Sequence, residues 1–255
     1  CYKFEQQDEN DEITLSPIEY NQILNIQQQI LEMVASHNQT SKILSKLCSL
    51  AESLLPNSVA SIMMKNKDTG LMSVICAPSI PQSGQERLAN LKPGPKGGSC
   101  GNAVFRNLPQ FVQNTFTDKR WENLRAVAID FNICSCWSVP IRDKMKDAIG
   151  SFALSSFEHR SPNPFHKELL KTASSIVSIV LTDEEIKKRN KLFSDAMQNS
   201  SDGMIITDEN NEIREVNEAI INCYGYAREE LIGKNPKILS SKEYNKNFYE
   251  KMWND

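Results

Sequence analysis

The spacing of hydrophobic residues changes along the chain, and the change predicts where helices give way to strands. In residues 18–36, isoleucines recur three and four residues apart, which is the spacing of one helix face. Ser16 and Pro17 place a capping residue and a first-turn proline at the start of this helix. Leucines at helical spacing predict a second helix, which ends before Pro56.

Shorter apolar runs follow and predict strands. The runs VASIMMK and LMSVICAP are typical of two strands with a hairpin turn at KNKDTG, while PQFVQN, ICSCWSVPI and IGSFALSSF predict three more. The Pro, Gly and Ser-rich residues 78–99 predict a loop, and TDKRWENLRAVAIDFN predicts a helix capped by Thr117. A long helix is expected over residues 161–199. This order predicts an α+β fold, an antiparallel sheet with flanking helices.

A second unit follows the long helix. SDGMIITDENNEIREVNEAIINCYGY predicts a strand, a turn, a strand and a helix, and REELIGKNPKIL predicts a helix start followed by a breaker. We therefore expect a polar linker over residues 1–15, a first domain over 16–183 that includes the start of a connector helix, the rest of the connector over 184–198, and a second domain over 199–255.

Composition narrows the class of partner. The chain has 255 residues and a formal net charge of -3. It therefore lacks the excess of basic residues that would favour a nucleic-acid partner. Its apolar runs are far shorter than the ~20 residues of a membrane span, so we expect no membrane contact in this segment. The first residue is Cys1 and the last residues form no turn or cap, and we interpret the chain as a piece of a longer protein.

Cysteine usage points to free thiols. The chain has seven scattered cysteines and no C-x-x-C pair, which favours a reducing cytoplasm and argues against a disulfide framework or a structural zinc site. Cys134 and Cys136 alternate along an expected strand and would share one face. Their spacing is too tight for an ordinary zinc site, and no histidine is near them in sequence, so we expect no metal.

The second unit resembles the front part of a PAS domain. The resemblance lies in GMIITDENNEIREVNEAIINCYGYAREELIGKNPKILSS and the later FYEKMW, and it covers residues 193–255. The strands that would complete such a domain are absent from this sequence, so a truncated PAS-like unit is expected.

The first unit resembles a GAF domain over residues 18–182. Its motifs appear in the order GGSCGNAVFRN, VQNTFTDKRW, CSCWSVPI and IGSFALSSF. The resemblance is to bacterial sensory modules that precede PAS, diguanylate cyclase or cyclic-diguanylate phosphodiesterase domains. It implies a sensor without catalysis in this fragment, regulating a downstream output domain such as a diguanylate cyclase, a phosphodiesterase or a histidine kinase.

The stretch KGGSCGNAVFRN is the candidate binding loop. Its glycines permit a close backbone approach, and the helix that follows would point its first N–H groups at the loop. In the GAF resemblance, TDKRW corresponds to the segment that closes over the ligand cleft. The ligand-binding residues expected from these patterns are Ser99, Cys100, Trp121, Cys134 and Cys136.

Two other functions remain open. The G-x-C-G element also resembles free-methionine-sulfoxide reductases, which implies a thiol-based redox enzyme or sensor using Cys100 with Cys134 or Cys136, the only cysteines within reach. The second open function is that of a dimerisation module with an empty pocket. The residues that bind cyclic nucleotides, bilins or haem in other GAF domains have no counterpart here, so the cofactor is unidentified and a small organic ligand is the expected occupant.

The connector helix is expected to form a homodimer. Ile179, Ile186 and Phe193 stand seven residues apart, as in one seam of a coiled coil, while Asp183 and Asn190 interrupt the companion positions. A seam with polar interruptions would shift easily between two registers. We therefore expect ligand binding in the GAF-like cleft to be relayed through this helix.

Overall fold

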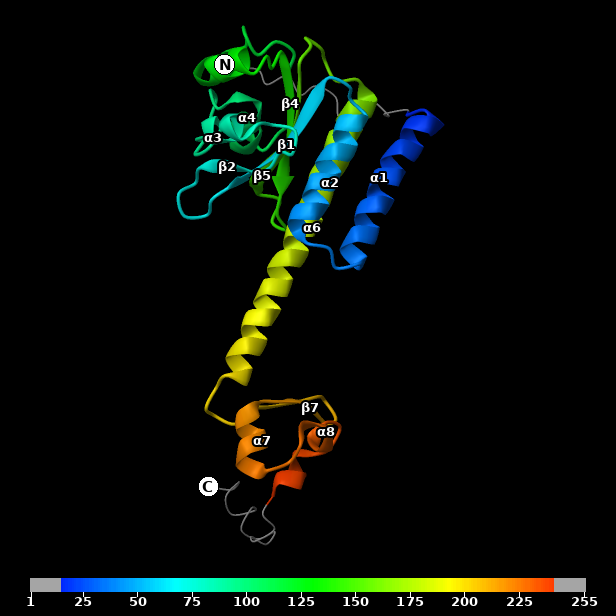
Figure 1. Cartoon of the computed structure of the whole chain (residues 1–255), viewed down its shortest axis with the longest axis vertical. Coiled ribbons are helices and arrows are strands. Elements are labelled where there is room, and N and C mark those ends of the chain that lie inside the picture. Colours follow the sequence, from blue (N-terminus) through cyan, green and yellow to red (C-terminus); the bar gives the residue numbers. More distant parts are fainter. Residues whose placement is uncertain (1–14, 241–255) are drawn as a thin grey trace, which may run out of the picture. The chain divides into compact units, whose positions relative to one another are not determined.

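The computed structural model describes residues 15–240 (Figure 1). Cys1, the expected linker up to residue 14 and the FYEKMW segment lie outside the described residues. The chain divides into two compact units, one ending at Glu184 and the other beginning at Glu185. No helix in the described range is both long and apolar enough to cross a membrane.

The first unit is built on a five-stranded sheet in which every neighbouring pair is antiparallel. The strand order is β2-β1-β5-β4-β3. The strands are β1 (Ser58–Lys65), β2 (Met72–Cys76), β3 (Gln110–Val112), β4 (Ser135–Arg142) and β5 (Ala148–Ser156). The α+β class predicted from the sequence, an antiparallel sheet with flanking helices, is confirmed.

One face of the sheet carries the large apolar core. Helices α1 (Pro17–Ala35), α2 (Thr40–Ser53) and the first half of α6 (Pro164–Gln198) pack there, as Figure 1 shows. The core includes Ile30, Leu47, Trp137, Phe152 and Leu169. Burial of such side chains is the main favourable contribution to folding, at about 25 cal/mol per Å² of apolar area.

The start of α1 follows from its sequence. The Ser16 hydroxyl accepts a hydrogen bond from the Glu19 backbone N–H, and the Glu19 carboxylate accepts from the Ser16 N–H at 2.9 Å. These bonds pair donors that a helix end otherwise leaves free. The Ser16 hydroxyl, which also donates to the Glu19 carboxylate at 2.7 Å, and the Ser16 N–H lower the pKa of Glu19.

The opposite face of the sheet is covered by short elements. They are α3 (Gln82–Arg87), α4 (Gly98–Arg106), the 3₁₀ helix η1 (Lys119–Leu124) and α5 (Arg125–Asp130). Here the sequence-based prediction was partly wrong. The expected loop over residues 78–99 contains α3, and Asp118 rather than Thr117 caps the next helix, because its carboxylate accepts from the Arg120 N–H at 2.8 Å.

The second unit contains a β hairpin and short helices. Strands β6 (Ile205–Thr207) and β7 (Ile213–Val216) pair antiparallel and are followed by α7 (Glu218–Tyr224), α8 (Arg228–Leu231) and η2 (Pro236–Leu239). Its core combines Ile213, Val216, Ile220 and Leu231.

Asn217 organises the second unit from a fully buried position. Its amide donates to the carbonyl of Met197 at 3.1 Å and to that of Asp202 at 2.8 Å. Its side-chain oxygen accepts from the Met204 N–H and caps α7 through the Ile220 N–H. One side chain therefore ties the end of α6 to the strand and helix of this unit.

Candidate functional site

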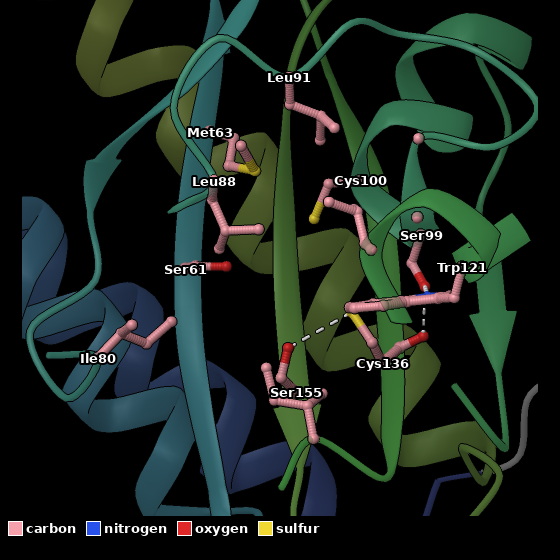
Figure 2. A pocket seen from close by; sticks show the side chains of 14 residues that line it. Ser61, Met63, Ile80, Leu88, Leu91, Ser99, Cys100, Trp121, Cys136 and Ser155 are labelled. Carbon is pink, nitrogen blue, oxygen red and sulfur yellow. Dashed lines mark hydrogen bonds between the residues drawn. The ribbon is translucent and has the colours of Figure 1, made fainter. Parts of the chain in front are cut away.

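A small cavity lies between the sheet and the loop before α4 (Figure 2). Ser99, Cys100, Trp121 and Cys136 contribute to its lining. Its volume is about 20 Å³, which is room for about one water molecule. The structure thus brings four of the five expected residues to one space, and that space is nearly filled by side chains.

Trp121 and Ser99 are held together by a short chain of hydrogen bonds. The Trp121 indole N–H donates to the Ser99 hydroxyl oxygen at 3.0 Å, and that hydroxyl donates to the Cys136 carbonyl at 2.9 Å. Ser99 is fully buried and Trp121 is 4% exposed. Because the indole donor is paired, the ring can form an otherwise apolar wall without leaving a polar group unsatisfied.

Gly98 permits this arrangement. Its φ is +66°, and a Cβ atom there would lie 2.8 Å from Leu124 Cδ1 and 3.6 Å from the Trp121 ring. Only a glycine combines the left-handed backbone with this closeness at low energy. The Gly-Gly pair in the binding loop therefore lets η1 close against α4.

The side chains of Cys100 and Cys136 line the same cavity. The hydrogen bond from the Cys136 thiol lowers the pKa of Cys100 to about 7, although burial acts against it. The same contact, with burial, raises the pKa of Cys136. The Ser155 hydroxyl also donates to Cys136 Sγ at 3.4 Å. Cys100 is therefore the more acidic thiol of the two.

Cys134 lies apart from this group. It precedes β4, its thiol donates to the Asn132 carbonyl at 3.7 Å, and it does not line the cavity. The alternation that would have placed it beside Cys136 does not apply, because the strand begins only at Ser135. Trp137, by contrast, occupies the large core on the other face of the sheet, where its indole donates to the Arg160 carbonyl.

A larger apolar groove adjoins the cavity. Its volume is about 270 Å³, and Ile80, Leu88 and Ile133 line both spaces. The other groove residues come from β1, the segment before α3, α3, α5 and the residues directly after α5 and β5: Val59, Ser79, Pro81, Gly84, Val127, Phe131 and Phe157. At 270 Å³ the groove approaches the ~300 Å³ lower limit of small-molecule sites.

An ion pair spans the elements that border this groove. The Arg87 guanidinium of α3 pairs with Asp130 of α5, and lies 5.7 Å from the centre of the Phe131 ring. Sequence reasoning missed the groove, although Ile80 and Leu88 are apolar residues inside a segment that otherwise predicts a polar loop. Between residues 15 and 240, no cluster of three or more His, Cys, Asp or Glu side chains is placed to hold a metal ion.

Comparison with protein families decides the classification. A family model described as GAF domain matches residues 38–182, more than half of the chain. The chain belongs to the GAF domain family. A second model, described as PAS fold, matches residues 191–255. GAF and PAS domains are sensory modules that are generally not catalytic.

A curated relative supports a sensory role for this GAF chain. The methyl sulfide methyltransferase-associated sensor of Methanosarcina acetivorans is 21% identical over 231 residues. The match covers 89% of this chain and 23% of the relative, so the chain spans about a quarter of that protein. Together with the two family matches, this relative identifies the chain as a sensory region of a signal-transduction protein.

Solved structures share the fold of the GAF domain. The GAF domain of a phosphoenolpyruvate-protein phosphotransferase from Coxiella burnetii has a TM-score of 0.57 at 15% identity, over 66% of this chain and 98% of that one. The reduced form of fRMsr from Staphylococcus aureus has a TM-score of 0.50 at 19% identity, over 62% of this chain and 94% of that one. At these identities the likeness concerns the fold alone.

Proposed function

We propose that the GAF domain binds a small, largely apolar molecule in the groove and the adjoining cavity, and that occupancy is relayed through α6 to a downstream output domain. The observation that carries this proposal is that the two spaces adjoin and share part of their lining. They share Ile80, Leu88 and Ile133, and movement of these side chains would join a 270 Å³ groove to the buried Ser99–Trp121 wall. Such a joined space has the mostly apolar lining with few polar groups that is typical of ligand sites.

The site residues in this proposal are Ser99, Cys100, Trp121 and Cys136. Cys134 lies outside both spaces, so any effect on a ligand would be indirect. The ligand would place an apolar body against the groove and its polar end near the Ser99 hydroxyl or the Cys100 sulfur. We propose a cytoplasmic location, because the six described cysteines are all free, as in a reducing compartment.

Binding is tested with an apolar fluorescent probe, 8-anilinonaphthalene-1-sulfonate, followed by a metabolite library read by thermal shift. Leu88→Trp, which fills the groove from a partly exposed position, should abolish the probe signal and the shift. The matched control is Leu108→Trp, at a residue 57% exposed and outside the groove. Equal binding by both variants would refute the site.

The relay is proposed to use a homodimer formed along α6. Ile179, Ile186 and Phe193 are 58%, 47% and 65% exposed, so the stripe with seven-residue spacing is available to a second copy of the chain. A diguanylate cyclase, a phosphodiesterase or a histidine kinase are the expected classes of output domain. If no ligand binds and the dimer persists, the remaining function is that of a dimerisation module.

A second candidate function rests on the Cys100–Cys136 pair. A thiol with a pKa of about 7 beside a second thiol is suited to reduce a sulfoxide, forming a disulfide and water while the sulfoxide becomes a thioether. The test is reduction of free methionine sulfoxide by the purified chain with a thiol donor. Cys100→Ser should remove that activity, and sulfoxide reduction that persists in this variant would refute the thiol chemistry.

A further inference from the structure

A second pair of cysteines lies away from the cavity. Cys48 is on α2, and Cys76 ends the edge strand β2. Their sulfur atoms are 4.0 Å apart, with the Cys48 thiol donating to the Cys76 sulfur. Both side chains belong to the core on the α1, α2 and α6 face of the sheet, whereas Cys100 and Cys136 lie on the other face.

The two thiols differ in environment. Cys48 is fully buried, whereas Cys76 is partly exposed. The hydrogen bond from Cys48 lowers the pKa of Cys76, and the same bond and burial raise the pKa of Cys48. Exposure and hydrogen bonding therefore agree on the roles: Cys76 is the more accessible and more acidic thiol, and Cys48 is a protonated neighbour within reach.

We propose that Cys48 and Cys76 are an oxidation site, at which a peroxide converts the two thiols to an intrachain disulfide. The Cys76 thiolate attacks one oxygen of hydrogen peroxide, the O–O bond breaks, and hydroxide leaves and takes up a proton to become water. The sulfenic acid formed on Cys76 is then attacked by the Cys48 sulfur, so that the S–S bond forms as the S–O bond breaks. The Cys48 proton leaves with the departing oxygen in a second water.

The electron balance is complete. The two cysteines lose two electrons and two protons, and peroxide gains them to give two molecules of water. The sulfur atoms must close from 4.0 Å to the ~2.05 Å of a disulfide bond. This movement is within the reach of side-chain rotation combined with a small shift of the Cys76 end of β2, because the bridge from β2 to Leu91 lies at Met72, at the opposite end of the strand.

A disulfide here would act on the segment that leads to the groove. Residues 77–81 follow Cys76 directly, and Ser79, Ile80 and Pro81 line the groove. The Ser79 hydroxyl already donates to the Glu52 carboxylate of α2 at 2.7 Å, and that carboxylate also accepts from the Ala60 N–H at 2.8 Å. Oxidation would add a covalent link from α2 to the same segment, whether or not a ligand binds.

The test uses the full chain, reduced and then exposed to hydrogen peroxide. Free thiols are blocked with iodoacetamide before tryptic digestion. Trypsin releases residues 47–65 and 68–87 as separate peptides with one cysteine each. The expected result is a linked peptide pair two hydrogens lighter than the sum of its parts, which dithiothreitol separates. The proposal would be overturned if, after peroxide treatment, both peptides carried as much iodoacetamide label as in the untreated protein.

Three variants sharpen the result. Cys48→Ala should leave a Cys76 sulfenic acid that dimedone traps, whereas Cys76→Ala should leave Cys48 unoxidised because it is buried. Cys100→Ser should still form the 48–76 link, which separates this site from the cavity thiols. Circular dichroism confirms that each variant is folded. A link from Cys76 to Cys100, Cys136 or Cys223 instead of Cys48 would also refute the assignment.

Discussion

Trp121 and Ser99 depend on each other: the indole donor has its partner in a serine that is itself completely buried. Ser99→Ala would leave the indole N–H unpaired inside the protein. We expect a loss of about 1–3 kcal/mol in the free energy of unfolding, the usual penalty for an orphaned buried donor. Urea denaturation measures it.

The matched control is Ser155→Ala. Ser155 is also buried, but its hydroxyl donates only to the weakly accepting sulfur of Cys136 at 3.4 Å. We expect this change to cost less than about 1 kcal/mol. Equal destabilisation by the two variants would show that the Trp121 contact contributes nothing specific.

Gly98→Ala should destabilise the first unit more than Gly70→Ala. Both glycines have a left-handed backbone, with φ of +66° and +71°, so both variants carry a backbone penalty of about 1–2 kcal/mol. A Cβ at residue 98 would in addition meet Leu124, whereas nothing lies within 4 Å at residue 70. Comparison of the two unfolding midpoints isolates the packing contribution, and a smaller loss for Gly98→Ala would contradict it.

The lowered pKa of Cys100 predicts a dependence of stability on pH. The folded thiol ionises near pH 7 and the ordinary value is 9.0, so between these pH values the unfolded state binds more protons. The contribution of Cys100 to the free energy of unfolding should therefore rise from about pH 7 to about pH 9, and be lost as the pH falls through 7. Urea titrations at several pH values measure the slope.

The reference for that slope is Cys100→Ser. Cys76 also has a lowered pKa and titrates in the same direction, so only the difference between wild type and this variant reports Cys100. Thiolate absorbance at 240 nm gives an independent measurement. A difference curve that is flat between pH 7 and 9 would be incompatible with the Cys100 thiolate.

Asn217→Ala should destabilise the second unit. The change removes the cap of α7 and the hydrogen bonds to the carbonyls of Met197 and Asp202. We expect the free energy of unfolding of this unit to fall by about 2–4 kcal/mol. Hydrogen exchange in residues 205–224 measures it. Asn235→Ala, which removes an exposed cap at the start of η2, should cost about 0.5–1 kcal/mol. The hypothesis is rejected if both variants exchange alike.

Ile186→Asp should weaken self-association along α6. The residue is central to the seven-residue stripe and is exposed in the single chain, so a carboxylate would be buried in a dimer seam. Light scattering after gel filtration measures the mass. Met145→Asp, at a residue 82% exposed in the turn between β4 and β5, should leave the mass unchanged. A monomeric wild type would end the dimer proposal.

The periodicity of hydrophobic residues was sufficient to locate the long helices and strands of this fold. The isoleucine spacing and the Ser16 cap located α1, and the change to short β-branched runs located β1 and β2. The short helix α3 was missed, because its sequence QSGQER has no apolar face and contains Gly84. It is held by its neighbours, since a Cβ at residue 84 would lie 3.0 Å from Ile80 and 3.3 Å from Phe131.

The site was predictable only in part. The glycine-rich loop and TDKRW pointed to Ser99, Cys100 and Trp121, and the alternation within the strand pointed to Cys136. The groove was beyond this reasoning, because its lining comes from segments that are distant in sequence, such as Val59 and Phe157. A local sequence pattern does not predict which distant side chains the tertiary fold brings together.

The three side chains shared by the two spaces carry no polar atom, since Ile80, Leu88 and Ile133 are all aliphatic. A molecule that pushes past them is not selected by hydrogen bonding along the way. Any polar group on the molecule loses its hydration as it passes these side chains, and it finds a hydrogen-bond partner only in the cavity. A long apolar body with a single terminal polar group therefore meets the smallest energetic barrier, and sugars and nucleotides meet the largest.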